Sequence, residues 1–104
     1  MSPKSGRVRL DLNNPPFQRS LFALQKDQQR AVLNTLGKIL DMSWDQVYQD
    51  PGLKWELISS RTGDKGERAY TLRIGKGFRA VAYREGDWLR LISLHPDHDS
   101  AYER

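Results

Sequence analysis

The sequence predicts an α+β domain in which helices cover one face of a curved antiparallel sheet. Two observations support this prediction. In the first half of the chain, apolar residues recur at the three-four spacing of an amphipathic helix. In the second half, short apolar runs alternate with glycine-bearing links, which is typical of antiparallel hairpins. The 104 residues suit one domain, 1–104, with a single core, and we expect residues 1–6 to be a disordered tail.

An N-terminal strand is expected at 7–12, because Val8, Leu10 and Leu12 alternate with charged residues there. Asn14 is a good helix N-cap, and the two prolines that follow it fit the first turn of a helix. The strand should therefore end where the first helix begins.

The helical stripe that follows is made of Phe17, Leu21, Leu24, Ala31, Leu36 and either Ile39 or Leu40. Gln28 interrupts this stripe, and Gly37 weakens a helix by about 1 kcal/mol relative to alanine. The segment therefore forms either one long helix or two shorter ones. We expect the leucines of the stripe to lie in the core.

A further helix is expected after Ser43, which forms a capping box with Gln46 three residues later. The run Asp50-Pro51-Gly52 should end it, since a residue before proline avoids the helical region. Three or four antiparallel strands follow, with candidates at 53–59, 68–74, 78–84 and 88–94.

Charge is unevenly distributed along the chain. The formal net charge is +4, yet residues 53–84 alone carry eight basic and three acidic side chains, which gives +5. Such a region attracts phosphate-rich nucleic acid or an acidic protein, although a solubilising surface explains it equally well. The basic candidates for contact with nucleic acid are Lys54, Arg61, Lys65, Arg68 and Lys76.

Several classes of protein are disfavoured by composition. The chain has no cysteine, which excludes a disulfide framework and cysteine zinc sites and suits a reducing cytoplasm. The first ten residues lack the apolar core of a signal peptide. No apolar run approaches the roughly 20 residues that span a bilayer. We therefore expect a cytoplasmic protein that is not bound to a membrane.

The segment ISLHPDHDSAY, at 92–102, gathers both histidines near the end of the chain. Histidine titrates near neutral pH and transfers protons readily, and Asp97 or Asp99 can orient it. The same residues also suit a polar turn in which the aspartates accept backbone N–H groups. A metal site ranks last, because a catalytic metal needs about three convergent protein ligands. We expect no metal and no cofactor.

The order strand, helices and meander, with the hairpin YTLRIGKGFRAVAY and the terminal HPDHDSAY, resembles the RelE/ParE superfamily of type II toxins. The motif likeness covers the C-terminal half, and the architecture covers the whole chain. The RelE-like branch cuts messenger RNA on the ribosome without a metal, and the resemblance favours that branch. It also implies a cognate antitoxin as partner.

The resemblance implies catalytic roles for five residues. Arg79 would contact the scissile phosphate, and Arg73 would be the basic residue on the neighbouring strand. His95 or His98 would transfer a proton, and Tyr102 would stack on a base. Glu56, on the strand before the hairpin, is a possible base because some relatives use a glutamate there, although a solvated strand residue explains it better.

Two other functions remain open at this point. A ParE-like toxin would bind a protein target such as DNA gyrase through the same basic face without catalysis. A relative without toxicity would act as a nucleic-acid-binding or interaction module. Replacement of both histidines separates the catalytic toxin from the binding toxin, since only the catalytic toxin needs them.

Overall fold

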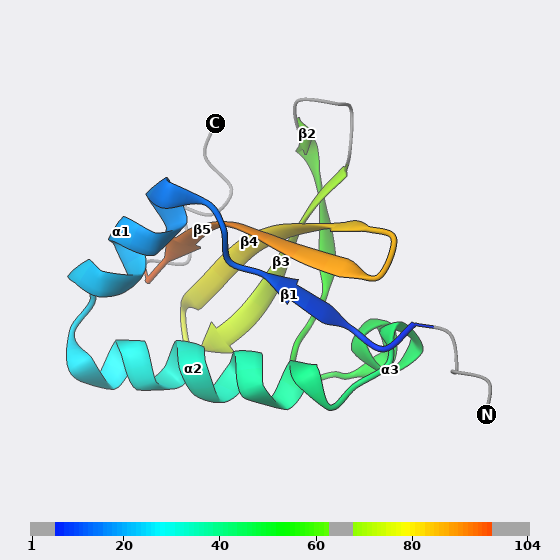
Figure 1. Cartoon of the computed structure of the whole chain (residues 1–104), viewed down its shortest axis with the longest axis horizontal. Helices are drawn as coiled ribbons and strands as arrows, with labels where there is room; N and C mark the ends of the chain where they lie inside the picture. Colours follow the sequence, from blue (N-terminus) through cyan, green and yellow to red (C-terminus); the bar gives the residue numbers. More distant parts are fainter. Residues whose placement is uncertain (1–5, 63–67, 97–104) are drawn as a thin grey trace.

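The structure is a computed structural model that describes residues 6–62 and 68–96 (Figure 1). Three helices lie against a sheet, which confirms the α+β class. The elements in chain order are β1 (Arg9–Asp11), α1 (Pro15–Ala23), α2 (Lys26–Leu40), α3 (Trp44–Gln49), β2 (Glu56–Thr62), β3 (Arg68–Gly75), β4 (Phe78–Glu85) and β5 (Trp88–His95).

The sheet has five strands in the order β1-β5-β4-β3-β2. The last four form the predicted antiparallel meander, and the short strand β1 adds to its edge in parallel with β5. This parallel pair joins the two ends of the described chain, as Figure 1 shows for the blue and orange strands. The N-terminal strand was itself predicted, but a parallel partner so distant in sequence leaves no local pattern. The expected sheet of three or four strands therefore gains β1 and has five.

The long helical segment splits, but at a different place from the expected one. The break falls at Leu24 and Gln25, where Gln25 caps α2 and forms a capping box with Gln28. Gln28 therefore lies in the first turn of α2 and does not interrupt a helix. Gly37 lies inside α2, where a Cβ would meet nothing within 4 Å, and the helix tolerates it.

Other local predictions are confirmed. Pro15 occupies the first turn of α1, and Ser43 and Gln46 form the reciprocal capping box of α3. Of the expected tail at 1–6, only Gly6 is among the described residues. It is buried, and its carbonyl accepts the backbone N–H of Trp44 at 2.8 Å.

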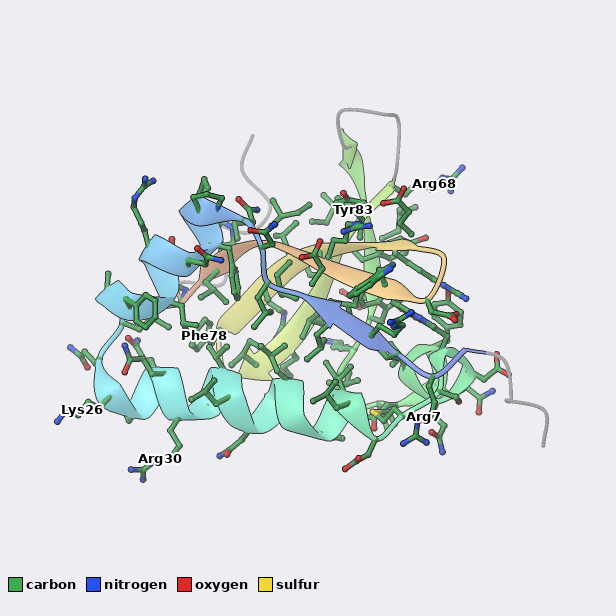
Figure 2. The ribbon with its side chains drawn as sticks, viewed as in Figure 1. Arg7, Lys26, Arg30, Arg68, Phe78 and Tyr83 are labelled. Carbon is green, nitrogen blue, oxygen red and sulfur yellow. The ribbon has the colours of Figure 1, made fainter. Side chains whose placement is uncertain are left out.

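The core lies between the helices and one face of the sheet. Phe17 from α1, Val32 from α2 and Trp44 from α3 are all at most 2 % exposed and pack with apolar residues of β3, β4 and β5. Phe78 enters this core between the sheet and the helices (Figure 2). The prediction that Leu40 is core is wrong, since its exposure is 49 % while its neighbour Ile39 is fully buried.

Candidate functional site

The side of the sheet that faces away from the helix core carries three of the five predicted catalytic residues. In register across β3, β4 and β5, Arg73 pairs with Arg79, and Arg79 pairs with His95. Residues directly opposite in a sheet point to the same face, with Cβ atoms about 5 Å apart. We call these three residues the Arg-Arg-His row. Residues 6 and 16 positions apart in sequence thus become immediate neighbours.

A bulge in β5 brings His95 to this face. Leu89 and Leu91 point into the core, as alternation requires, but the next core residue is Leu94 rather than residue 93. The pairing with β4 shifts register at this point, so that Val81 pairs with Ser93 while Ala82 pairs with Leu91. One extra residue on β5 therefore reverses the phase of the strand. Without it, His95 would point toward the core.

Asn14 supports the strand at this bulge. Its side-chain amide donates to the carbonyl of Leu91 at 3.1 Å and to that of Ile92 at 3.3 Å. Strand β1 ends at Asp11, so it does not reach these two carbonyls. Asn14 sits at the N-cap position of α1, but its side chain does not cap the helix, and that part of the prediction is wrong.

We expect Asn14→Asp to lower the free energy of unfolding by about 1 to 3 kcal/mol, the penalty for unsatisfied buried polar groups. The carboxylate has the shape of the amide but would place its oxygens against the two carbonyls. Urea denaturation measures the change, with Asn13→Asp, an exposed neighbour, as the matched control. Equal effects of the two substitutions would show that the amide contributes little to this contact.

Arg79 is the unusual member of the Arg-Arg-His row. It is only 7 % exposed, although it carries a full charge. Its Nε and Nη1 atoms are buried, and neither has a hydrogen-bond partner in the described part of the chain. A buried guanidinium without partners is costly, and the like charge of Arg73 directly opposite adds to the cost. Both costs fall when an anion binds between the two side chains.

Two basic candidates gather near the same end of the sheet. Lys76 is exposed in the turn between β3 and β4. Lys54 is exposed and lies beside β3, because the backbone N–H of Arg73 donates to the carbonyl of the preceding residue, Leu53, at 2.7 Å. Together they extend the positive surface around Arg73.

Other basic candidates do not join this group. Arg68 begins β3, five residues before Arg73, which is roughly 16 Å along a strand. Figure 2 shows it projecting at the opposite end of the strand. Arg84, another basic residue of the 53–84 region, lies 4.6 Å from the Trp44 ring and donates to the Tyr48 hydroxyl at 2.6 Å, so it contacts α3 instead.

Several predicted residues lie outside the described residues. These are Lys65, His98 and Tyr102, together with the side chain of Arg61, whose backbone belongs to β2. The possible ligands Asp97 and Asp99 fall there too. Within 6–62 and 68–96, no three His, Cys, Asp or Glu side chains gather as metal ligands would. No helix of the described chain is long and apolar enough to cross a membrane.

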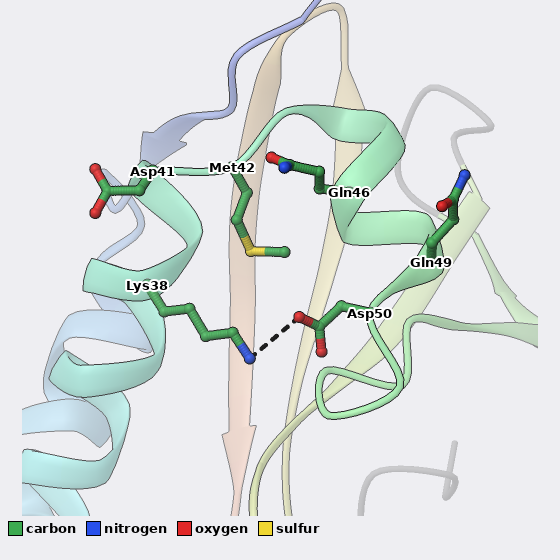
Figure 3. Close-up of a pocket in the computed structure, with 6 residues that line it drawn as sticks. All are labelled: Lys38, Asp41, Met42, Gln46, Gln49 and Asp50. Atoms are coloured by element: carbon green, nitrogen blue, oxygen red, sulfur yellow. Dashed lines mark ion pairs between the residues drawn. The ribbon is translucent and has the colours of Figure 1, made fainter.

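A hollow of about 370 Å³ lies between the end of α2 and α3, apart from the Arg-Arg-His row (Figure 3). The end of β5 lies at the other side of the molecule (Figure 1). Lys38 and Asp50 line the hollow and pair with each other at 3.2 Å, and Asp50 also accepts two backbone N–H groups. These charges are thus engaged in holding the loop after α3 rather than directed at a ligand.

The pair predicts a pH dependence. Burial raises the pKa of Asp50, but hydrogen bonds from Leu53, Lys38 and Gly52 outweigh burial and bring the pKa below its usual 3.8. The ionised carboxylate therefore stabilises the fold above that value, and this contribution is lost as the pH falls through the lowered pKa.

We expect Asp50→Asn to be less stable than wild type at pH 7, by on the order of 1 kcal/mol or less for so exposed a pair. The gap should close below pH 3.8. Thermal unfolding between pH 2 and pH 7 measures it, with Asp41→Asn as a control that removes the same charge from the same hollow. A gap that stays constant with pH would refute the role of the carboxylate charge.

Ser93 was not predicted as a site residue, yet it belongs to this face. It pairs with Val81 and lies next to the Arg-Arg-His row, and its Oγ is 2.8 Å from Nε2 of His95. The signal was present in the sequence, because the core spacing Leu89, Leu91, Leu94 breaks alternation just before Ser93. Glu56 ends up at the edge of the same face, exposed and paired with Thr71.

The fold is similar to that of a solved structure, "Crystal structure of archaeal RelE-RelB complex from Pyrococcus horikoshii OT3". The TM-score is 0.58 at 16 % sequence identity, and the match covers 89 % of this chain and 96 % of that chain. No protein-family model and no curated protein matches the sequence. At this identity the likeness concerns the fold alone, and it confirms the RelE-like architecture that the sequence motifs predicted.

Proposed function

We propose that this chain is a toxin-like endoribonuclease that cleaves messenger RNA, in a ribosome-dependent manner, by attack of the 2′-hydroxyl on the adjacent phosphorus. One observation carries the proposal: the Arg-Arg-His row places two guanidinium groups and an imidazole side by side on one sheet face. Cleavage of RNA without a metal requires positive charge at the phosphoryl oxygens and groups that take and give a proton, and the row supplies the charge and one of the proton-transfer groups.

The two arginines bind and neutralise the phosphate. Two buried nitrogens of Arg79, Nε and Nη1, have no partners among the described residues, and a phosphate that displaces what covers them can accept from both. Arg73 is exposed on the neighbouring strand and reaches the same group from the other side. Negative charge on the phosphoryl oxygens grows as the 2′-oxygen attacks, so fixed positive groups stabilise the transition state more than the substrate.

His95 moves the proton. As the new bond from the 2′-oxygen to phosphorus forms, the 2′-hydroxyl gives its proton to a base, for which Glu56 on the same sheet face is a candidate. The bond from phosphorus to the 5′-oxygen breaks at the same time, and the leaving oxygen takes a proton from the His95 imidazolium. The imidazole lies directly across from Arg79, which holds the phosphate. The products are a 2′,3′-cyclic phosphate and a 5′-hydroxyl. His98 and Tyr102 remain candidates for proton transfer and base stacking.

The partner proposed for this toxin is a cognate antitoxin. The structural neighbour is a RelE protein in complex with RelB, and this chain shares its fold. A segment of the antitoxin would cover the Arg-Arg-His row or an edge of the sheet. If that segment is acidic, its carboxylates would accept hydrogen bonds from the same guanidinium groups that bind RNA. The proposed place of action is the cytoplasm, where translating ribosomes are found.

Primer extension on messenger RNA in a cell-free translation reaction tests the proposal. Wild type should give cuts at codon-phased positions. Arg79→Ala and the double variant His95→Ala/His98→Ala should give none, while Arg30→Ala on the outer side of α2 (Figure 2) should cut like wild type. Intact message with undisturbed translation, from protein shown to be folded and free of antitoxin, would refute the proposal.

A further inference from the structure

The contact between Ser93 and His95 is the basis of a further inference. Both residues belong to β5, two positions apart, and the distance from Ser93 Oγ to His95 Nε2 is 2.8 Å. Side chains two apart on a regular strand stand parallel and perpendicular to the sheet. The bulge beside Ser93 changes this local geometry, and the imidazole points back along its own strand to the hydroxyl.

A hydroxyl suits a group that gains and loses a proton. Serine Oγ can donate to the lone pair of a neutral imidazole nitrogen, and it can accept from the N–H of an imidazolium by rotating its own hydrogen. A carboxylate could accept only, and a lysine could donate only. A serine partner can therefore hold the ring in one place before and after proton transfer.

The surroundings leave little tolerance for movement of the ring. His95 is paired with Arg79 on the adjacent strand. Arg73 lies one strand further, and Glu56 lies at the edge of the same face. A ring that turns away from its contact with Ser93 also leaves the phosphate that Arg79 would hold. Misplacement of a reacting group by about 1 Å can lower a rate roughly 100-fold.

We propose that Ser93 is a positioning residue that holds the His95 imidazole through Nε2, next to the Arg79 guanidinium, in both protonation states. Its effect on cleavage rests on the proposed ribonuclease function, whereas its effect on the imidazole does not. Ser93 need not touch RNA. Its role differs from that of a residue that only stabilises β5, since the hydroxyl and not the strand is what matters.

The first test is nitrogen NMR of the free protein with labelled histidine, in a His98→Gln background that leaves one imidazole. Ser93→Ala should move the Nε2 resonance toward that of a free imidazole and mix the two tautomers. Ser93→Thr keeps the hydroxyl and should retain the spectrum of its parent. Ser20→Ala, a serine in α1, is the matched control and should change nothing. An Nε2 signal unaltered by Ser93→Ala would overturn the proposal.

The second test is the rate of single-turnover cleavage on programmed ribosomes. Ser93→Ala should lower the saturated rate roughly 10- to 100-fold, with the half-saturating concentration changed less than about twofold, because phosphate binding by the arginines persists. Ser93→Thr should restore most of the rate. An unchanged rate in Ser93→Ala, or equal losses in both variants, would overturn the positioning role.

The two tests separate this inference from the proposed function. If wild type leaves message intact, the ribonuclease proposal fails, and the imidazole spectra alone then decide whether Ser93 holds His95. If wild type cleaves and the spectra of wild type and Ser93→Ala coincide, the ribonuclease stands and the positioning role is refuted.

Discussion

Replacing Arg79 with methionine is expected to abolish RNA cleavage and at the same time to raise the free energy of unfolding by about 1 to 3 kcal/mol. The side chain is 7 % exposed, with two nitrogens that find no partner in the described residues. Methionine fills a similar volume without a charge to desolvate. Removal of the guanidinium also relieves its repulsion with Arg73 across the strand pair. Opposite changes in stability and activity are the mark of a functional residue held at a cost to the fold.

Urea denaturation and primer extension measure the two effects on the same preparations. Arg73→Met is the control for stability, since that side chain is exposed and its loss should change unfolding by less than about 0.5 kcal/mol. Arg30→Met is the control for cleavage. A destabilised Arg79→Met protein would mean that the guanidinium is structural, and the anion site would then lose its main support.

The largest loss of stability is expected at Trp44, where alanine should lower the free energy of unfolding by about 3 to 5 kcal/mol. The indole is 2 % exposed, lies 5.5 Å from the ring of Trp55, and is covered by Arg84. Its Nε1 donates to the carbonyl of Asp87 at 3.0 Å, which ties α3 to the turn before β5.

A matched variant separates packing from hydrogen bonding at this position. Trp44→Phe keeps an aromatic ring but loses the donor to Asp87, so it should lose less stability than alanine does. The slope of unfolding free energy against urea should stay constant if both variants unfold in two states. A loss below about 1 kcal/mol for alanine would contradict the assignment of Trp44 to the core.

Local signals predicted much of the fold. The Ser43–Gln46 capping box, the proline start of α1 and the short turns of the meander depend on neighbouring residues, and all are confirmed. Features set by distant partners were missed. One is the parallel pairing of the edge strand β1 with β5. Another is the side chain of Asn14, which donates to a backbone carbonyl of β5 and does not cap its own helix α1. An asparagine before a helix favours capping of that helix, and only the folded chain brings the competing carbonyls of Leu91 and Ile92 within its reach.

The candidate site was predictable in part. The GKG turn between Arg73 and Arg79 correctly indicated that the two lie on neighbouring strands. Alternation along β4 could not reveal that Arg79 is buried, since burial depends on what surrounds the sheet face. The position of His95 depends on the bulge in β5. Strict alternation of side chains along the strand would place His95 on the core face instead.

The chemistry of the cut ends tests the central claim most directly. Message cleaved during translation with wild-type protein is recovered, and its new 5′ ends are ligated to an adaptor with and without prior phosphorylation by a kinase. Attack by the 2′-hydroxyl predicts ligation only after kinase treatment, because the 5′ ends are hydroxyls, together with 3′ ends that carry a cyclic phosphate. New ends that ligate without the kinase, and so carry a 5′-phosphate, would contradict cleavage by the Arg-Arg-His row.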